Sequence, residues 1–280
     1  MRIRATVAAV SGALALSALA VPAAQAEDAP KAGGLSAFSA QAPADDAYGD
    51  TQITNVVVNG GKDIVLGTTA AKTINVSVTV TDNSGVDNAD VALWHGSSFE
   101  DPDGFLLSDQ FMNDEKATCT ASSATTSTCK LTIPVDPQVD LYKNSLAGTW
   151  KVAAIGWGKD GDFIEKDAYK THRVQRASTL TVNAAPEPVV KGKPITVTGK
   201  LARANWETST YAGYTAQPVK LQFRKAGTTT YTTVKTVNTD STGNLKTTVT
   251  AASDGYWRWS FAGTSTTPAV SAAGDYVDVR

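Results

Sequence analysis

The stretch Ile74–Thr81, which reads INVSVTVT, decides the fold class of this chain. Its apolar and polar residues alternate strictly, so one face of an extended strand would be apolar and the other polar. A helix would instead need apolar residues three or four positions apart. No useful length of that spacing occurs after residue 26. The sequence therefore predicts a half-buried β-strand in an all-β protein.

Two series of similar runs predict two antiparallel Ig-like sandwiches in tandem. The first domain spans residues 51–177, with further candidate strands at 53–58, 91–94, 131–133, 148–157 and 169–174. The second domain spans residues 178–280, with candidates at 180–182, 195–201, 219–223, 230–237, 245–250, 256–261 and 276–279. Seven short strands in about 100 residues are typical of an Ig-like sandwich. In the sixth run, Trp257, Trp259 and Phe261 alternate with polar residues and should face the core.

The first 26 residues predict a secretory signal peptide. Arg2 and Arg4 precede the apolar run Ala5–Val21, and Ala24–Ala26 provides a cleavage site with small residues. Residues 27–50 are mostly Ala, Pro, Gly, Ser and Asp, which predicts a flexible leader. No later segment has 18 consecutive apolar residues, so we expect no membrane span. These features predict a secreted, extracellular protein.

The two cysteines, Cys119 and Cys129, predict one disulfide in that oxidising compartment. The alternative is a metal or redox pair, which normally has other spacing or a nearby histidine. Charge also divides the chain. Residues 27–177 hold 21 acidic and 12 basic residues, a net of −9, whereas residues 178–280 hold 6 acidic and 11 basic residues, a net of +5. Opposite signs suggest mutual attraction or two faces for different partners.

Several blocks carry a family resemblance. The C-terminal ones are Ser178–Val189 (STLTVNAAPEPV), Val219–Lys225 (VKLQFRK) and Asp254–Gly263 (DGYWRWSFAG); the N-terminal ones are Val56–Gly61 (VVVNGG) and Thr81–Val86 (TDNSGV). They resemble secreted tandem Ig-like proteins of filamentous Gram-positive bacteria, in which an uncharacterised module precedes a bacterial Ig-like domain. The resemblance implies two β-sandwiches outside the cell. Such proteins are sometimes labelled calcium-binding, and the family offers no catalytic residues to transfer.

Acidic and amide side chains predict a calcium site in the first domain. Asp82, Asn83 and Asp87 follow the second strand, and Asp160 and Asp162 precede the last. In an Ig-like sandwich both loops lie at the same end, where oxygens could converge on calcium. We place Asn88, Asp90, Glu165 and Asp167 in the same two loops. The alternative is that these residues only form solvated turns.

Three aromatic residues form a second candidate site. Trp206, Tyr211 and Tyr214 lie in an insertion of the second domain. They would either form the contact between the domains or provide a platform for a sugar ring, since exposed aromatic residues mark binding without naming the partner.

Residues for catalysis are few. The chain has two histidines, His95 and His172, and no Gly-x-Ser-x-Gly motif. We therefore expect a secreted, non-enzymatic binding or structural protein at or near the cell envelope, with a cell-surface polymer or protein as partner. Nucleic acid is not expected, because the basic residues form no nucleic-acid motif. The alternatives are a calcium-binding extracellular module, a carbohydrate-binding accessory protein, or a hydrolase with an unrecognised carboxylate pair. No cofactor other than calcium is expected.

Overall fold

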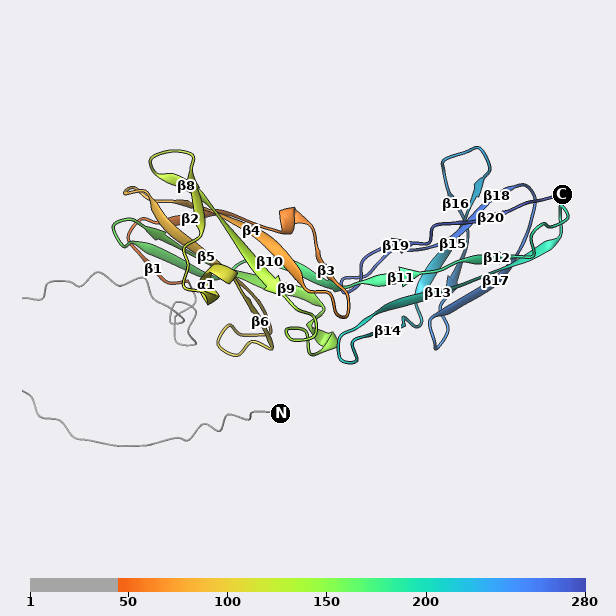
Figure 1. Ribbon diagram of the computed structural model, residues 1–280, viewed down its shortest axis with the longest axis horizontal. Coiled ribbons are helices and arrows are strands. Elements are labelled where there is room, and N and C mark those ends of the chain that lie inside the picture. The colour runs from red at the N-terminus through yellow and green to blue at the C-terminus, as the bar shows by residue number, and fades with distance from the viewer. Residues whose placement is uncertain (1–44) are drawn as a thin grey trace, which may run out of the picture. The chain divides into compact units, whose positions relative to one another are not determined.

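The computed structural model describes residues 45–280 and confirms the expected all-β fold (Figure 1). The predicted signal peptide and most of the predicted leader lie outside the described residues. Two residues that we assigned to the leader form strand β1 (Ala47–Tyr48), which pairs with β10 (Phe163–Arg176). The one α-helix of the described chain is α1 (Asp109–Met112), and no described helix has the length and apolarity needed to cross a membrane.

The first sandwich consists of two sheets. In one, β1 and β10 are followed by β9 (Gly148–Gly158), β5 (Val86–His95) and β6 (Gly104–Leu107), while β3 (Ile64–Leu66) joins β10 in parallel. In the other, the order is β2 (Gln52–Val58), β4 (Lys72–Thr81), β8 (Thr126–Val135) and β7 (Thr118–Ala121). The stretch that predicted the fold lies in β4, where its four apolar residues are buried and its polar residues are not.

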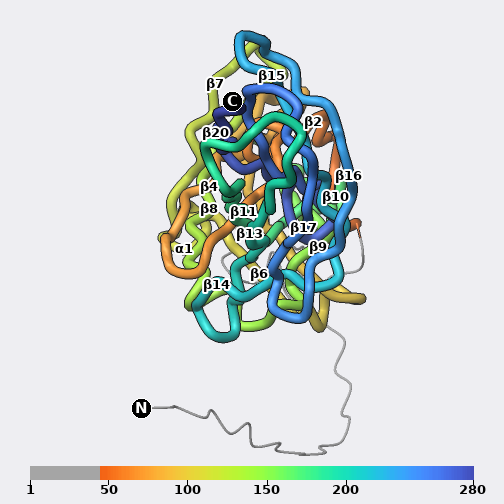
Figure 2. The backbone as a smooth tube through the Cα atoms, turned by 90° about the vertical axis from the view of Figure 1, so that its right-hand side faces the viewer, coloured from red at the N-terminus to blue at the C-terminus, as the bar shows by residue number. Residues whose placement is uncertain are grey.

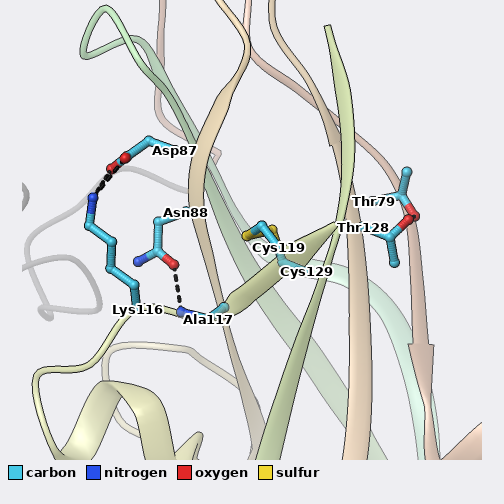
Figure 3. The surroundings of a disulfide bond; sticks show 8 residues. All are labelled: Thr79, Asp87, Asn88, Lys116, Ala117, Cys119, Thr128 and Cys129. Carbon is cyan, nitrogen blue, oxygen red and sulfur yellow. Dashed lines mark hydrogen bonds and ion pairs between the residues drawn. A yellow bond between two sulfur atoms is a disulfide. The ribbon is translucent and has the colours of Figure 1, made fainter. Parts of the chain in front are cut away.

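Burial of apolar side chains between these sheets is the main stabilising term of the first sandwich. Trp150 is fully buried there, and its indole Nε1 donates a hydrogen bond of 2.7 Å to the Leu146 carbonyl. The predicted disulfide joins Cys119 and Cys129, which are direct partners across β7 and β8, with an S–S bond of 2.00 Å (Figure 3). The disulfide therefore fixes an edge strand to the sheet whose inner face forms the core.

The β5–β9 sheet is also covered on its outer face. Ala92, Trp94 and Ala153 point outward and form a second apolar cluster with Phe99. The Trp94 indole donates a hydrogen bond of 2.6 Å to the Asp167 carbonyl, so its one polar group is satisfied. Side chains that alternation alone would assign to solvent are therefore buried.

The second sandwich begins at β11 (Ser178–Leu180), and its strands run from green to blue in Figure 2. One sheet gathers β11, β12 (Asn183–Ala185), β14 (Thr210–Gly213) and β17 (Asn244–Thr250) around the long β13 (Pro194–Asn205). The other contains β16 (Thr232–Asn238), β15 (Pro218–Lys225), β18 (Gly255–Phe261), β19 (Val270–Ser271) and β20 (Asp275–Val277). Trp257, Trp259 and Phe261 are buried between these sheets, as their alternation predicted.

Candidate functional site

Two loops of the first sandwich meet at one end and form an acidic cluster. The Lys159 amide donates to the Gly85 carbonyl at 2.9 Å, and the Asp160 amide donates to the Ser84 hydroxyl at 3.2 Å. Next to these contacts lie Asp50, Asp82 and Asp162, which we call the acidic cluster. One carboxylate oxygen of each lies within 4.8 Å of the other two. Three carboxylates at this separation could share one hard cation.

Asp82 is the buried member of the acidic cluster. Its carboxylate accepts hydrogen bonds from the Thr51 hydroxyl at 2.5 Å, the Ser84 amide at 2.8 Å and the Ser84 hydroxyl at 2.6 Å. Burial by itself would raise the pKa of Asp82, but the hydrogen bonds from Ser84 and Thr51 outweigh it and hold the pKa below its usual range. A Cβ at Gly158 would overlap this carboxylate, so the Asp82 side chain would have to move if Gly158 were replaced.

The other members are more exposed and are joined through neighbours. Asn83 donates to the Asp50 carboxylate at 2.6 Å, and the Asp50 amide donates to Asp162 at 3.1 Å. Asp160 accepts from the Asp162 amide at 3.2 Å and so shapes the turn. Sequence reasoning missed Asp50 because the two-residue strand before it is too short to give a periodic signal. The turn residues Gly49 and Asp50 were the only available sign.

Asp87 does not belong to the acidic cluster. It forms an ion pair of 2.7 Å with Lys116, and the neighbouring Asn88 accepts a hydrogen bond of 2.9 Å from the Ala117 amide (Figure 3). Both residues lie in β5, which begins at Val86. Our placement of Asp87, Asn88 and Asp90 in a loop was wrong, because pairing with β9 extends the strand through these polar residues.

Glu165 and Asp167 were also placed in a loop, and they lie instead within β10. They are 4% and 6% exposed, and one oxygen of each, Glu165 Oε1 and Asp167 Oδ1, is buried without a hydrogen-bond partner. Burial, with the nearby charges of Asp167 and Asp46, raises the pKa of Glu165 to about 7. Burial, with the charges of Asp45 and Glu100, also raises the pKa of Asp167.

Asp90 belongs to the same outer face as Glu165. Register across the sheet places both residues beside Ile155, one on each side. Burial raises the pKa of Asp90 to about 6, although hydrogen bonds from Ser108 and the Val91 amide oppose the shift. A buried carboxyl group with a raised pKa lowers the free energy of unfolding at neutral pH, because it must either ionise while buried or take up a proton on folding.

The three aromatic residues of the insertion do not form one exposed platform. Trp206 is 3% exposed, packs into the core of the first sandwich, and donates from Nε1 to the Gly67 carbonyl at 2.9 Å. Tyr211 is 44% exposed. The Tyr214 ring packs edge-on against Phe261, with ring centroids 5.6 Å apart. A sugar could not stack on Trp206, because both faces of its ring are already covered by protein.

Backbone hydrogen bonds surround the connection at Ala177, the one residue between β10 and β11. The Ala177 amide donates to the Leu66 carbonyl at 2.8 Å, and its own carbonyl accepts from the Ala204 amide at 2.8 Å. Asn144 of the first sandwich accepts from the Trp206 amide at 3.0 Å and donates to Asn205 at 2.8 Å. The connection therefore has its polar groups paired with both sandwiches.

Comparisons with known proteins give a partial family match. A model described as "Family of unknown function (DUF5707)" matches residues 66–156, which is 91 of the 280 residues and lies within the first sandwich. No curated protein matches the chain.

Several solved structures are similar to this chain at low sequence identity. The D00–D0 domain of Intimin is 15% identical, with 80% of this chain and 99% of that chain covered and a TM-score of 0.26. The Yersinia pseudotuberculosis adhesin InvE is 17% identical, with 81% and 56% covered and a TM-score of 0.24. The titin domains Z1Z2 in complex with telethonin are 10% identical, with 84% and 97% covered and a TM-score of 0.22. At such TM-scores the likeness carries no argument about function.

Proposed function

We propose that this chain is a secreted, non-enzymatic protein that binds a polymer or another protein at or near the cell envelope. The signal peptide predicted for residues 1–26 and the disulfide support an extracellular location, since disulfides persist in oxidising compartments. In this proposal the two sandwiches present surfaces of opposite charge to the surroundings.

The observation that carries the proposal is the paired connection at Ala177 together with the burial of Trp206. A flexible linker would leave its backbone groups to water, whereas this connection hydrogen-bonds them to Leu66 and Ala204. Trp206 reaches from the second sandwich into the core of the first, where burial of so large a side chain contributes about 3 kcal/mol. These contacts support a role in which two binding or spacing surfaces are held together.

Sedimentation of the mature protein with envelope material from the producing cells tests this function. We expect the protein to pellet with the envelope at physiological salt and to be released as salt is raised, because its charged surfaces are exposed. Protein that stays in the supernatant at every protein concentration would contradict the proposal. A hydrolytic release of soluble sugar or peptide from the envelope would contradict the non-enzymatic part.

A second candidate function, calcium binding, is favoured by the acidic cluster. Its three carboxylates and the neighbouring Asn83 offer the oxygen ligands that calcium prefers, and calcium tolerates irregular geometry. Asp82 already accepts three hydrogen bonds, so its remaining lone pairs limit what it can give to an ion.

Thermal unfolding with calcium, with magnesium and with a chelator separates calcium binding from a turn that needs no ion. Binding would raise the melting temperature in calcium, and Asp162→Asn would remove that rise. Asp87→Asn, whose carboxylate pairs with Lys116 outside the cluster, is the matched control and should keep it. An unmutated protein with the same melting temperature in calcium and in chelator would end this candidate.

A further inference from the structure

The outer face of one sheet of the second sandwich gathers arginines and tyrosines from separate strands. In β18 the residues that alternate with the buried Trp257 and Trp259 point outward. Register places Arg258 beside Gln222 of β15, Arg224 beside Tyr256, and Tyr256 beside Tyr276 of β20. Tyr231, just before β16, completes what we call the arginine–tyrosine face: Arg224, Tyr231, Tyr256, Arg258 and Tyr276.

Both guanidinium groups stack on tyrosine rings. Arg258 Cζ lies 3.8 Å from the Tyr231 ring centroid, and Arg224 Cζ lies 4.1 Å from that of Tyr256 and 5.3 Å from that of Tyr231. A Cβ on Gly274 would come within 2.5 Å of the Tyr231 hydroxyl, so Tyr231 reaches across the face as far as β20. Stacking holds a guanidinium plane in one orientation and leaves its edge for hydrogen bonding.

The two arginines have no carboxylate partner within 4.0 Å among residues 45–280. Arg258 donates from Nε to the Gln222 side-chain oxygen at 2.9 Å, and Arg224 donates to the Thr228 carbonyl. A guanidinium carries five N–H donors, so donors remain on each. Lys220 lies on the same face of β15 and adds a third positive charge.

Two carboxylates, Asp254 and Asp278, lie near Tyr276 at the edge of this cationic area. The Tyr276 ring is 40% exposed, and the partial burial of its hydroxyl together with Asp254 and Asp278 raises the pKa of that hydroxyl. Asp278 is paired with Arg280 at 2.9 Å, and Asp254 accepts from the Val279 amide at 2.8 Å. These acids are engaged at the β20 side, which leaves Arg224, Arg258 and Lys220 as the charges of the central area.

We propose that the arginine–tyrosine face binds an anionic carbohydrate polymer, that is, sugars bearing carboxylate or phosphate groups. The guanidinium edges would bind the anionic groups, for which their fork of donors is suited, and the exposed tyrosine would pack against sugar rings. The proposal rests on the proposed function and names its ligand class. The positive charge without a carboxylate partner, next to the exposed Tyr276 ring, is what favours an anionic sugar over a neutral one.

Calorimetric titration of the mature protein with polygalacturonate tests the proposal, with dextran as the neutral polymer and polyphosphate as the anion without sugar. We expect binding to polygalacturonate and no measurable binding to dextran. The double variant Arg224→Gln/Arg258→Gln should weaken binding at least about tenfold, because two charge-assisted contacts are lost. Tyr276→Ser, a separate change on the same face, should weaken polygalacturonate binding about threefold and leave polyphosphate binding unchanged.

A matched control is Lys200→Gln/Lys246→Gln, which removes the same charge from exposed positions on β13 and β17 of the opposite sheet. It should retain binding. An equal loss in both double variants would overturn the site, since net charge alone would then account for it. Polyphosphate binding as tight as polygalacturonate binding would overturn the carbohydrate part.

Two further outcomes would overturn the proposal. In the first outcome, the protein does not bind polygalacturonate but still sediments with envelope. That result would contradict the proposed ligand class and would not contradict the proposed function. The other is concentration-dependent self-association that the Arg224→Gln/Arg258→Gln variant loses, which would assign the face to the acidic sandwich of a second copy. Sedimentation equilibrium on the free protein measures the latter directly.

Discussion

Charged side chains at the candidate sites of the two sandwiches lie in different environments. In the first, Asp82 is enclosed by hydrogen bonds, and Glu165 and Asp167 are buried within a sheet. In the second, Arg224 and Arg258 lie on an outer face, stacked on tyrosines. These buried acids of the first sandwich therefore act on folding, whereas Arg224 and Arg258 of the second remain available to a ligand. Net charge alone, −9 against +5, does not reveal this difference.

Among the proposed changes, replacing Trp206 should lower the free energy of unfolding the most. Trp206→Ala would remove an indole from the first core and leave the Gly67 carbonyl without its donor. We expect a loss of about 3–5 kcal/mol in the free energy of unfolding, measured by urea denaturation. Tyr211→Ala, at an exposed position of the same insertion, should cost less than about 1 kcal/mol. Equal effects of the two changes would show that Trp206 does not join the sandwiches.

Removal of the disulfide should affect the first sandwich alone. Cys119→Ser/Cys129→Ser opens a loop with a sequence separation of 10, for which chain entropy predicts a loss of about 2–3 kcal/mol. We expect amide exchange to accelerate in β7 and β8 and to stay unchanged in β15 and β18. Faster exchange across both sandwiches would mean that they unfold as one unit. The two sandwiches would then have no separate free energies of unfolding to compare.

A buried carboxylate gives a pH-dependent prediction. Glu165 has an ordinary pKa of 4.5 and a folded pKa of about 7, so the folded state binds its proton more tightly. The stability from this proton is present below about pH 4.5 and is lost as the pH rises to 7. Glu165→Gln, which keeps the neutral form, should stabilise the protein by about 1–2 kcal/mol at pH 8 and hardly at pH 4.5.

Chemical denaturation at the two pH values measures that difference. Glu115→Gln, at an exposed position, is the control and should change stability little at either pH. If Glu165→Gln destabilised the protein at pH 8, the Glu165 carboxylate of the unmutated protein would have to be ionised and paired. That result would contradict the view that the buried acids of the first sandwich lower its stability.

The sequence predicted the strands well where alternation was strict and poorly where a sheet is covered on both sides. Ile74–Thr81 and Tyr256–Phe261 show alternation and lie in β4 and β18. Asp90 and Glu165 were assigned to loops because Asp, Asn and Gly are typical of turns, yet both lie in strands that pair with β9 and both are buried. Sequence spacing cannot show what covers an outer face, and that is also why Trp206 was not distinguished from an exposed aromatic residue.

Some residues of the candidate sites could be predicted from the sequence and others could not. Convergence of Asp82 with Asp162 follows from loops that share one end of the sandwich, and it was expected. Asp50 was missed because β1, the strand that precedes it, contains two residues. The arginine–tyrosine face depends on register across β15, β18 and β20, which no local pattern determines. Arg224 and Arg258 are far apart in the sequence, so their spacing gave no sign that they share a face.

Envelope sedimentation of the Arg224→Gln/Arg258→Gln variant tests most directly whether the basic sandwich carries the binding surface. Exposed stacking contributes about 0.5–1 kcal/mol per arginine, so the variant should remain folded at 25 °C. We predict that it stays in the supernatant under conditions in which the unmutated protein and the Lys200→Gln/Lys246→Gln variant both pellet. A folded Arg224→Gln/Arg258→Gln variant that pellets as completely as the unmutated protein would contradict the account.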